Sequence, residues 1–177
     1  GNLHESERCN IKVVEIRRRL WLGDSTRYGR DLALTLANLG IDRVLLGNHE
    51  GAIEATEESI LMLREISASD DSSLRRELAT VLNSLSNMLA QAGHGNRALT
   101  SAVESEALYR SLAQRDSALM TEHAGVLNTL SDRQASVGNL NASLLAMSEA
   151  LEILQSVEGS QQGKHEITEL AMCFHNH

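Results

Sequence analysis

The tetrapeptide Leu82-Asn83-Ser84-Leu85 has two close copies in this chain of 177 residues. The copies are Leu36-Ala37-Asn38-Leu39 and Leu127-Asn128-Thr129-Leu130, so the spacing is 46 and then 45 residues. A glycine lies eleven residues after the first leucine of each copy: Gly47, Gly93 and Gly138. An apolar, alanine-containing segment follows each glycine. A nearly constant period of this length predicts a solenoid, in which one small unit is stacked several times.

The composition predicts that these units are helical. Hydrophobic residues make up 42% of the chain but aromatic residues only 2%, so the core has to be built from aliphatic side chains and methionine. Small and aliphatic side chains suit helices that pack closely side by side. The sequence contains no proline and no strand-like runs of β-branched and aromatic residues, which favours an all-α chain.

The charge of the chain disfavours two classes of partner. A net charge of −8 disfavours nucleic acid, which requires a basic stripe, and it disfavours an anionic membrane surface. No apolar run of about 18 residues is present, so we expect no membrane span.

The cysteines bear on the cellular location. Cys9 and Cys173 lie near opposite ends of the array, which makes a disulfide between them implausible. We therefore expect a cytoplasmic protein.

The pattern of glycines and capping residues predicts the domain organisation. Residues 1–9 read as a disordered or tag-like N-terminus, and residues 10–175 as the repeat array. Within the array we expect a partial repeat at 10–22, complete repeats at 28–66, 74–113 and 118–157, and a partial repeat at 164–175. Glycine or asparagine should end the first helix of each repeat. Gly23-Asp24-Ser25-Thr26 and the serine- and aspartate-rich stretch 67–73 should start the next first helix.

The repeats resemble tetratricopeptide repeats, and specifically the kinesin-light-chain-like class with its Leu-Asn-x-Leu signature. The small residue that this family has after the turn matches Ala52, Ala98 and Ser143. A second small position matches Ser59, Ser105 and Ala150. The resemblance implies a right-handed α-solenoid of antiparallel helix pairs. The chain departs from the family in its longer period (about 34 is usual), its lack of proline, and Arg43 and Gln134 where the family has a large aromatic residue.

The resemblance also implies a binding groove lined by the first helices. Matching positions give Asn38, Asn83, Ser84, Asn87, Gln91, Asn128, Thr129 and Asp132 as partner-binding residues, with Ile41 beside them. A carboxamide both donates and accepts hydrogen bonds, so it can pair with the backbone of an extended peptide. We expect Asn83 and Asn128 to face solvent. The alternative is that these amides are merely solvated or cap neighbouring helix ends.

No pattern in the sequence indicates a catalytic, metal-binding or cofactor-binding site. The C-terminal residues His165, Cys173, His175 and His177 include metal-ligand types, but their spacing is not that of a structural zinc site. His49, His94 and His123 are expected to cap helix ends or face solvent. No nucleophile elbow and no phosphate-binding loop is present. We therefore expect no enzyme activity, no cofactor and no metal.

Two functions follow from these features. The first is a protein–protein interaction module, expected to be a fragment of a larger protein, that binds a peptide or partner protein in the concave groove. The second is a structural spacer or oligomerisation arm of a multidomain signalling protein. Incomplete repeats at both ends would expose apolar faces, which favours a homodimer through the terminal repeats.

Overall fold

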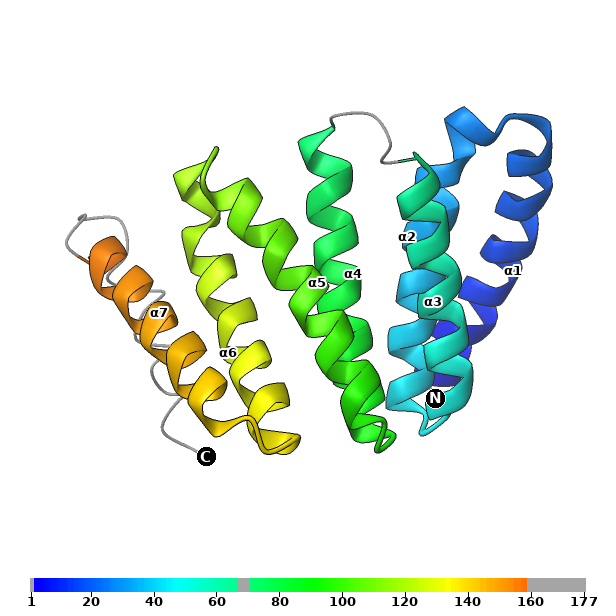
Figure 1. Cartoon of the computed structure of the whole chain (residues 1–177). Coiled ribbons are helices and arrows are strands. Elements are labelled where there is room, and N and C mark those ends of the chain that lie inside the picture. Colours follow the sequence, from blue (N-terminus) through cyan, green and yellow to red (C-terminus); the bar gives the residue numbers. More distant parts are fainter. Residues whose placement is uncertain (1, 67–70, 159–177) are drawn as a thin grey trace. The chain divides into compact units, whose positions relative to one another are not determined.

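A computed structural model describes residues 2–66 and 71–158 of the chain, and these residues are helical apart from short turns (Figure 1). The elements are α1 (Asn2–Gly23), α2 (Ser25–Leu45), α3 (His49–Ile66), α4 (Ser72–Gln91), α5 (Gly95–Ala113), the 3-10 turn η1 (Ser117–Leu119), α6 (Met120–Ser136) and α7 (Leu140–Glu158). The described ranges contain no strand, so the predicted all-α fold is confirmed. The predicted partial repeat 164–175 and the C-terminal His/Cys residues lie outside the described residues.

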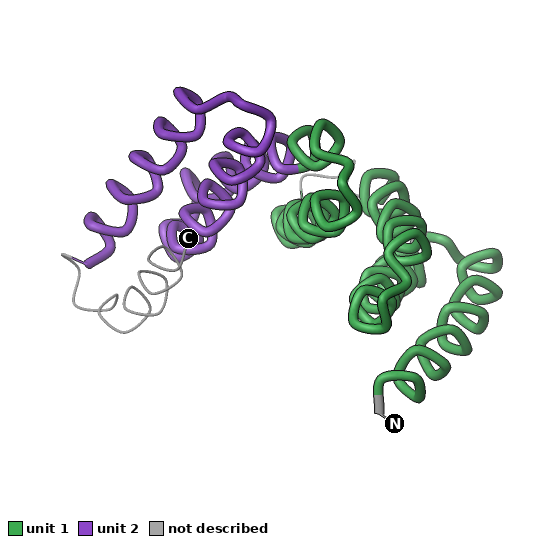
Figure 2. The backbone as a smooth tube through the Cα atoms, turned by 90° about the horizontal axis from the view of Figure 1, so that it is seen from below, with its two compact units in different colours: residues 1–101 green, residues 102–177 purple. Residues whose placement is uncertain are grey.

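The chain divides into two compact units, Gly1–Ser101 and Ala102–His177 (Figure 2). Unit 1 contains α1 to α4 and the first part of α5, and unit 2 contains the rest of α5 with η1, α6 and α7. In unit 1, α1 packs on α2, α2 on α3 and α3 on α4, and consecutive helices run in opposite directions (Figure 1). In unit 2, α6 packs on α7. Neighbouring antiparallel helices are the building plan of an α-solenoid.

The three glycine turns have the same conformation. Gly47, Gly93 and Gly138 have φ angles of 80°, 80° and 85°, in the left-handed region that glycine adopts without strain. In the first turn, Asn48 N donates to Arg43 O at 2.8 Å and Gly47 N to Val44 O at 2.9 Å. The same two bonds recur after α4 and α6. This pair of bonds is a Schellman motif, which ends a helix and reverses the chain.

Aspartate side chains start the first helices of the repeats in unit 1. Asp24 Oδ1 accepts from Arg27 N at 3.0 Å, and Asp71 Oδ1 accepts from Ser73 N at 2.8 Å. Backbone hydrogen bonding from Ser73 is the main cause that lowers the pKa of Asp71. The capping function predicted for both linkers is therefore confirmed.

The predicted small positions lie where paired helices approach closely. Ala52, Ala98, Ser59, Ser105 and Ala150 have no exposed surface, and Ser143 is also buried. Ser59 Oγ donates to the backbone oxygen of Ala33 on the facing helix at 2.7 Å. A side chain as short as serine reaches the opposite backbone only when two helices are close together, so larger residues would not fit there.

The N-terminal residues differ from the sequence prediction. Residues 2–9 were expected to be disordered or tag-like. The expected disorder was wrong, because α1 begins at Asn2 and these residues are helical. Ser6 Oγ and Asn10 Nδ2 donate to Asp42 Oδ2 at 2.9 and 2.7 Å, and Glu7 lies 3.7 Å from Arg43 Nε. Arg43 also donates to Gly51 O at 2.8 Å. The arginine that departs from the family pattern thus joins α1, α2 and α3.

Candidate partner-binding groove

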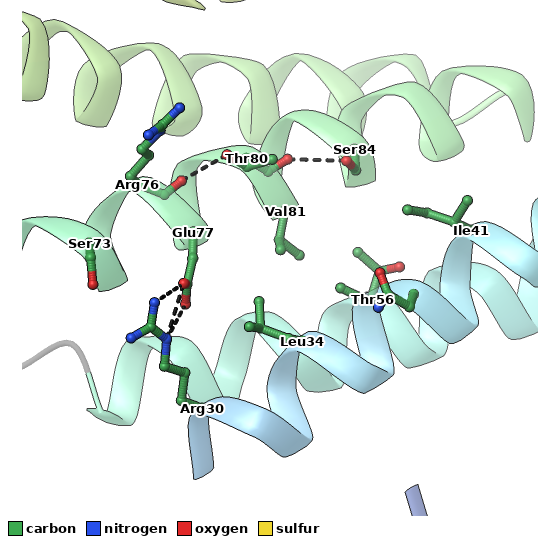
Figure 3. A pocket seen from close by; sticks show the side chains of 12 residues that line it. Arg30, Leu34, Ile41, Thr56, Ser73, Arg76, Glu77, Thr80, Val81 and Ser84 are labelled. Carbon is green, nitrogen blue, oxygen red and sulfur yellow. Dashed lines mark hydrogen bonds and ion pairs between the residues drawn. The ribbon is translucent and has the colours of Figure 1, made fainter. Parts of the chain in front are cut away.

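A groove of about 410 Å³ lies between α2 and α4 in unit 1 (Figure 3). Its lining residues are Arg30, Leu34, Ala37, Asn38 and Ile41 from α2, Thr56 from α3, and Ser73, Arg76, Glu77, Thr80, Val81 and Ser84 from α4. On each of the two long helices these residues recur every three or four positions, so they form one stripe per helix. The two stripes face each other across the groove.

The middle of the groove is apolar. Leu34 on α2 and Val81 on α4 point into the space between the helices (Figure 3). Val81 is buried and Leu34 half-buried, whereas Ile41 is 46% exposed at the rim. An aliphatic side chain of a partner would lose contact with water here, which is the main favourable term in most protein association.

A second hollow of about 170 Å³ continues the groove toward the C-terminal ends of α2 and α4. It shares Ile41 and Ser84 with the first hollow, and adds Val44, Leu45, Asn87, Met88 and Gln91. Leu45 is 60% exposed. The two hollows together form one groove, which we call the α2/α4 groove.

Charged residues close the other end of this groove. Arg30 Nε lies 3.1 and 3.2 Å from the two carboxylate oxygens of Glu77, and Arg30 Nη2 also donates to Glu77. The hydrogen bonding with Glu77 is the main cause that raises the pKa of Arg30. The pair joins α2 to α4, so it sets the distance between the two walls at this end (Figure 3).

The hydroxyl groups of α4 are oriented by their own helix. Thr80 Oγ1 donates to Arg76 O at 2.9 Å and Ser84 Oγ donates to Thr80 O at 3.1 Å. Because each hydroxyl hydrogen is used within the helix, the oxygen lone pairs are what these groups can offer to a ligand. The α4 wall therefore presents acceptors for N–H groups.

The structure gathers four of the eight predicted site residues in this groove: Asn38, Ser84, Asn87 and Gln91. Asn83 is half-buried and lines neither hollow, so the expectation that it faces solvent was wrong. Its Oδ1 is buried and meets no hydrogen-bond donor among the described residues. Asn128, Thr129 and Asp132 lie on α6 in unit 2, and Asn128 is half-buried, so it was also wrong to expect it in solvent.

Several groove residues were missed from the sequence. Leu34, Thr80, Val81 and the Arg30–Glu77 pair were not among the predicted site residues. Leu34, Thr80 and Val81 lie three or four positions from predicted ones, and Arg30 and Glu77 lie about one helical turn further along the same faces. The helical period from Asn38 and Ser84 is the signal that would have found them.

Unit 2 contains a buried polar cluster that the sequence did not predict. His123 was expected to cap a helix or face solvent, but it is only 4% exposed and its Nε2 lies 2.9 Å from Glu106 Oε1. Arg110 donates from Nε to the same oxygen at 2.8 Å, and from Nη1 and Nη2 to Glu149 at 2.6 and 2.9 Å. The cluster joins α5, α6 and α7 within unit 2.

The pKa of Glu106 follows from these contacts. Burial by itself raises the pKa of this carboxyl, but the hydrogen bond and charge of His123 and the charge of Arg110 outweigh burial and leave it below the usual range. Hydrogen bonding with Glu149 is the main cause that raises the pKa of Arg110. The charged forms of both residues are therefore favoured in the fold.

Within residues 2–66 and 71–158, no group of three histidine, cysteine, aspartate or glutamate residues has the arrangement to hold a metal ion. The same ranges contain no helix with the length and apolar character to cross a bilayer.

The sequence matches no model of a known protein family and no curated protein. Among solved structures, the chain is similar to BtubC (BKLC) from P. vanneervenii, with a TM-score of 0.65 and 19% sequence identity. The match covers 90% of this chain and 59% of the BtubC chain, so this chain spans less than two thirds of that length.

Two further matches are MamA, with a TM-score of 0.37 and 12% identity over 82% of this chain and 89% of MamA, and the DHF58 filament, with a TM-score of 0.41 and 16% identity over 94% and 86%. At these identities the comparisons concern the fold alone. The similarity to BtubC, together with the pairing of neighbouring helices, shows that the fold is an all-helical α-solenoid.

Proposed function

We propose that this chain is a protein-interaction module of the kinesin-light-chain-like tetratricopeptide class, and that the α2/α4 groove binds an extended peptide segment of a partner protein. The observation that carries the proposal is the groove itself, which combines an apolar middle with carboxamides on both walls and hydroxyl acceptors on the α4 wall. A few placed polar groups around an apolar hollow are typical of a ligand site.

The chemistry of the two walls fits a peptide backbone. Asn38 on α2 and Asn87 and Gln91 on α4 carry carboxamides, which pair with both the N–H and the C=O of an extended chain. Ser84, whose hydroxyl hydrogen is used within α4, adds an acceptor between them. Leu34, Ile41 and Val81 would hold an aliphatic side chain of the same peptide. Backbone contacts give affinity in this binding mode, and the apolar hollow gives selectivity.

The proposal extends to what the module does not do. We propose that it has no enzymatic activity and acts in the cytoplasm, with protein partners in place of nucleic acid or membrane. Within unit 2, the contacts of Glu106 with Arg110 and His123 are those of a packed helix junction, and the proposal assigns these residues a structural role.

The experiment that tests this function selects peptides from a random displayed library on the full chain and then measures their affinity for variants. Asn38→Ala combined with Asn87→Ala should weaken binding about tenfold or more, because each lost hydrogen bond contributes about 1 kcal/mol. Ile41→Asp should weaken binding further by placing a charge at the apolar hollow.

The matched control is Asn96→Ala, which removes an exposed carboxamide on α5 that does not line the groove. Its affinity for the selected peptides should equal that of the unaltered chain. If the groove variants bind as tightly as this control, the peptide site is not in the α2/α4 groove.

The alternative function, a structural spacer or oligomerisation arm, is favoured by one observation. Leu140, Leu144 and Leu145 on α7 are more than half exposed, as expected for a surface that contacts another copy. Sedimentation of the chain without ligand tests it. Assembly that grows with concentration would favour a homodimer through α7, and a constant monomer would favour the binding module.

A further inference from the structure

Helix α7 has two apolar faces, and the described structure covers only one of them. Ala146, Ala150 and Leu154 are buried and pack with Ala124 and Leu127 of α6. Leu144 and Leu151 belong to the other face and are 62% and 48% exposed. Exposed aliphatic side chains in a row on a helix normally mark a contact surface.

The repeat shows what covers this face elsewhere in the chain. In α3, the positions that correspond to Leu144 and Leu151 are Ile53 and Ile60, which are only 3% and 4% exposed. α3 packs against α4, the first helix of the following repeat. In α5 the position that corresponds to Leu151 is Glu106, whose side chain contacts His123 on the following first helix, α6. The open face of α7 is therefore the face against which a following first helix packs.

The sequence after α7 has the pattern of such a helix. Every first helix carries four positions with steps of three, one and three residues: 32, 35, 36 and 39 in α2, 78, 81, 82 and 85 in α4, and 123, 126, 127 and 130 in α6. All twelve positions are buried, and all but Thr35 and His123 are aliphatic. The segment 164–175 repeats these steps with Ile167, Leu170, Ala171 and Phe174.

The connection also has a suitable length. Five residues, 67–71, join α3 to α4, and the same number, 159–163, separate the end of α7 from residue 164. A connection that lets α4 pack on α3 is therefore long enough for residues 164–175 to reach α7.

We propose that residues 164–175 form the first helix of a fourth repeat and dock through Ile167, Leu170 and Phe174 on the Leu144/Leu151 face of α7. This contact is independent of what the α2/α4 groove binds. It would make α7 an internal helix of the array, and it would remove the apolar surface that otherwise favours self-association.

Thiol labelling in the full chain tests the proposal. Leu151→Cys places a thiol on the proposed contact face, and Leu145→Cys places one at a position whose counterparts in α3 and α5, Glu54 and Thr100, are both exposed. Both variants also carry Cys9→Ser and Cys173→Ala, which remove the native thiols. The thiol at 151 should react with a maleimide about tenfold or more slowly than the thiol at 145, because reaction requires local opening.

A second set of variants identifies the occupant. Ile167→Glu combined with Leu170→Glu should abolish the protection of the thiol at 151. His165→Glu combined with Met172→Glu adds the same charges off the apolar stripe and should leave the protection intact. Equal labelling rates at 151 and 145 would overturn the proposal. So would protection that disappears on dilution or survives Ile167→Glu/Leu170→Glu, because a second copy of the chain would then cover α7.

Discussion

Ile60 and Leu78 occupy in unit 1 the positions that Glu106 and His123 occupy in unit 2, counted along the repeat. All four side chains are buried, so both units use these positions in a packed helix junction. In unit 1 the junction between α3 and α4 is apolar there, whereas in unit 2 the junction between α5 and α6 holds an acid and a histidine 2.9 Å apart. The repeat thus accepts either an apolar pair or an acid–histidine pair at these two positions.

The difference shows that a polar side chain is accepted at this buried position when all of its hydrogen-bonding needs are met. An aliphatic pair needs none beyond contact, whereas a buried carboxylate needs donors, and Glu106 receives them from His123 and Arg110. A buried ion pair often stabilises a protein no more than an apolar pair of similar volume does. Removing only one member of the ion pair, however, strongly destabilises the fold because the other charge stays buried without its partner. The predictions below test this comparison of the two units, from the largest expected effect to the smallest.

The largest effect is expected from removing half of the polar pair. Glu106→Ile should lower the free energy of unfolding by about 3–5 kcal/mol, because His123 and Arg110 lose a buried acceptor. Urea unfolding followed by far-UV circular dichroism measures the change. Fluorescence of Trp21, the one tryptophan in the chain, reports unit 1 separately.

The second substitution turns the junction of unit 2 into that of unit 1. Glu106→Ile combined with His123→Leu should recover most of the lost stability, as expected when both members of a buried pair become apolar. A double variant that is as unstable as the sum of its single changes would show that the two positions are not coupled.

A smaller effect is expected at the α2/α3 contact. A Cβ atom at Gly40 would clash with Thr56 Oγ1 and lie 3.1 Å from Ala52 O. Unit 2 instead has Ser131 at the corresponding position, hydrogen-bonded to Ser143 at 2.9 Å. Gly40→Ala should therefore destabilise unit 1 by about 1–3 kcal/mol. Adding Thr56→Ala should relieve part of this cost. An increase in the urea midpoint of Trp21 fluorescence for Gly40→Ala would show instead that helix propensity, about 1 kcal/mol, outweighs the clash.

The next prediction concerns acid. The pKa of Glu106 is lowered in the fold, so its contribution to stability is present above the unfolded pKa of about 4.3 and is lost as the pH falls through the lower folded value. Glu106→Gln should remove this part of the pH dependence. Urea midpoints measured between about pH 7 and pH 3 should fall less steeply in Glu106→Gln than in the unaltered chain. Parallel curves would contradict the assignment.

The smallest effect is expected from a surface ion pair. Arg18 pairs with Glu58 at 2.6 Å in unit 1, and the residues two repeats further on, Arg110 and Glu149, form the same pair in unit 2. Arg18→Ala should cost no more than about 1 kcal/mol, since both partners are well exposed. Arg110→Ala should cost more, because Arg110 also holds Glu106. Equal urea midpoints for the two variants would contradict this difference.

The features that the sequence predicted are those that depend on local geometry. The glycine turns, the aspartate caps and the small residues at helix crossings follow from residue type and spacing, and the structure confirms them. Asn38, Ser84, Asn87 and Gln91 reached the groove because the period of a helix places them on one side.

The features that were missed depend on partners distant in sequence. The helical start of α1 is held by contacts to Asp42 and Arg43, more than thirty residues away. His123 looked like a helix-end residue because its acceptor, Glu106, lies on the preceding helix. Asn83 occupies the Asn position of the Leu-Asn-x-Leu pattern but lines neither hollow of the groove. The pattern alone does not fix the rotation of α4 about its axis, which decides which residues line the groove.

The central claim is that the α2/α4 groove binds a partner peptide, and the most direct test is to map where a selected peptide binds. Backbone amide NMR signals of the isotope-labelled full chain are compared with and without the peptide. We predict that the largest shifts occur at Asn38, Ile41, Ser84 and Asn87, with little change along α7. Shifts confined to α7 or to α6, with the α2/α4 groove unaffected, would contradict the claim.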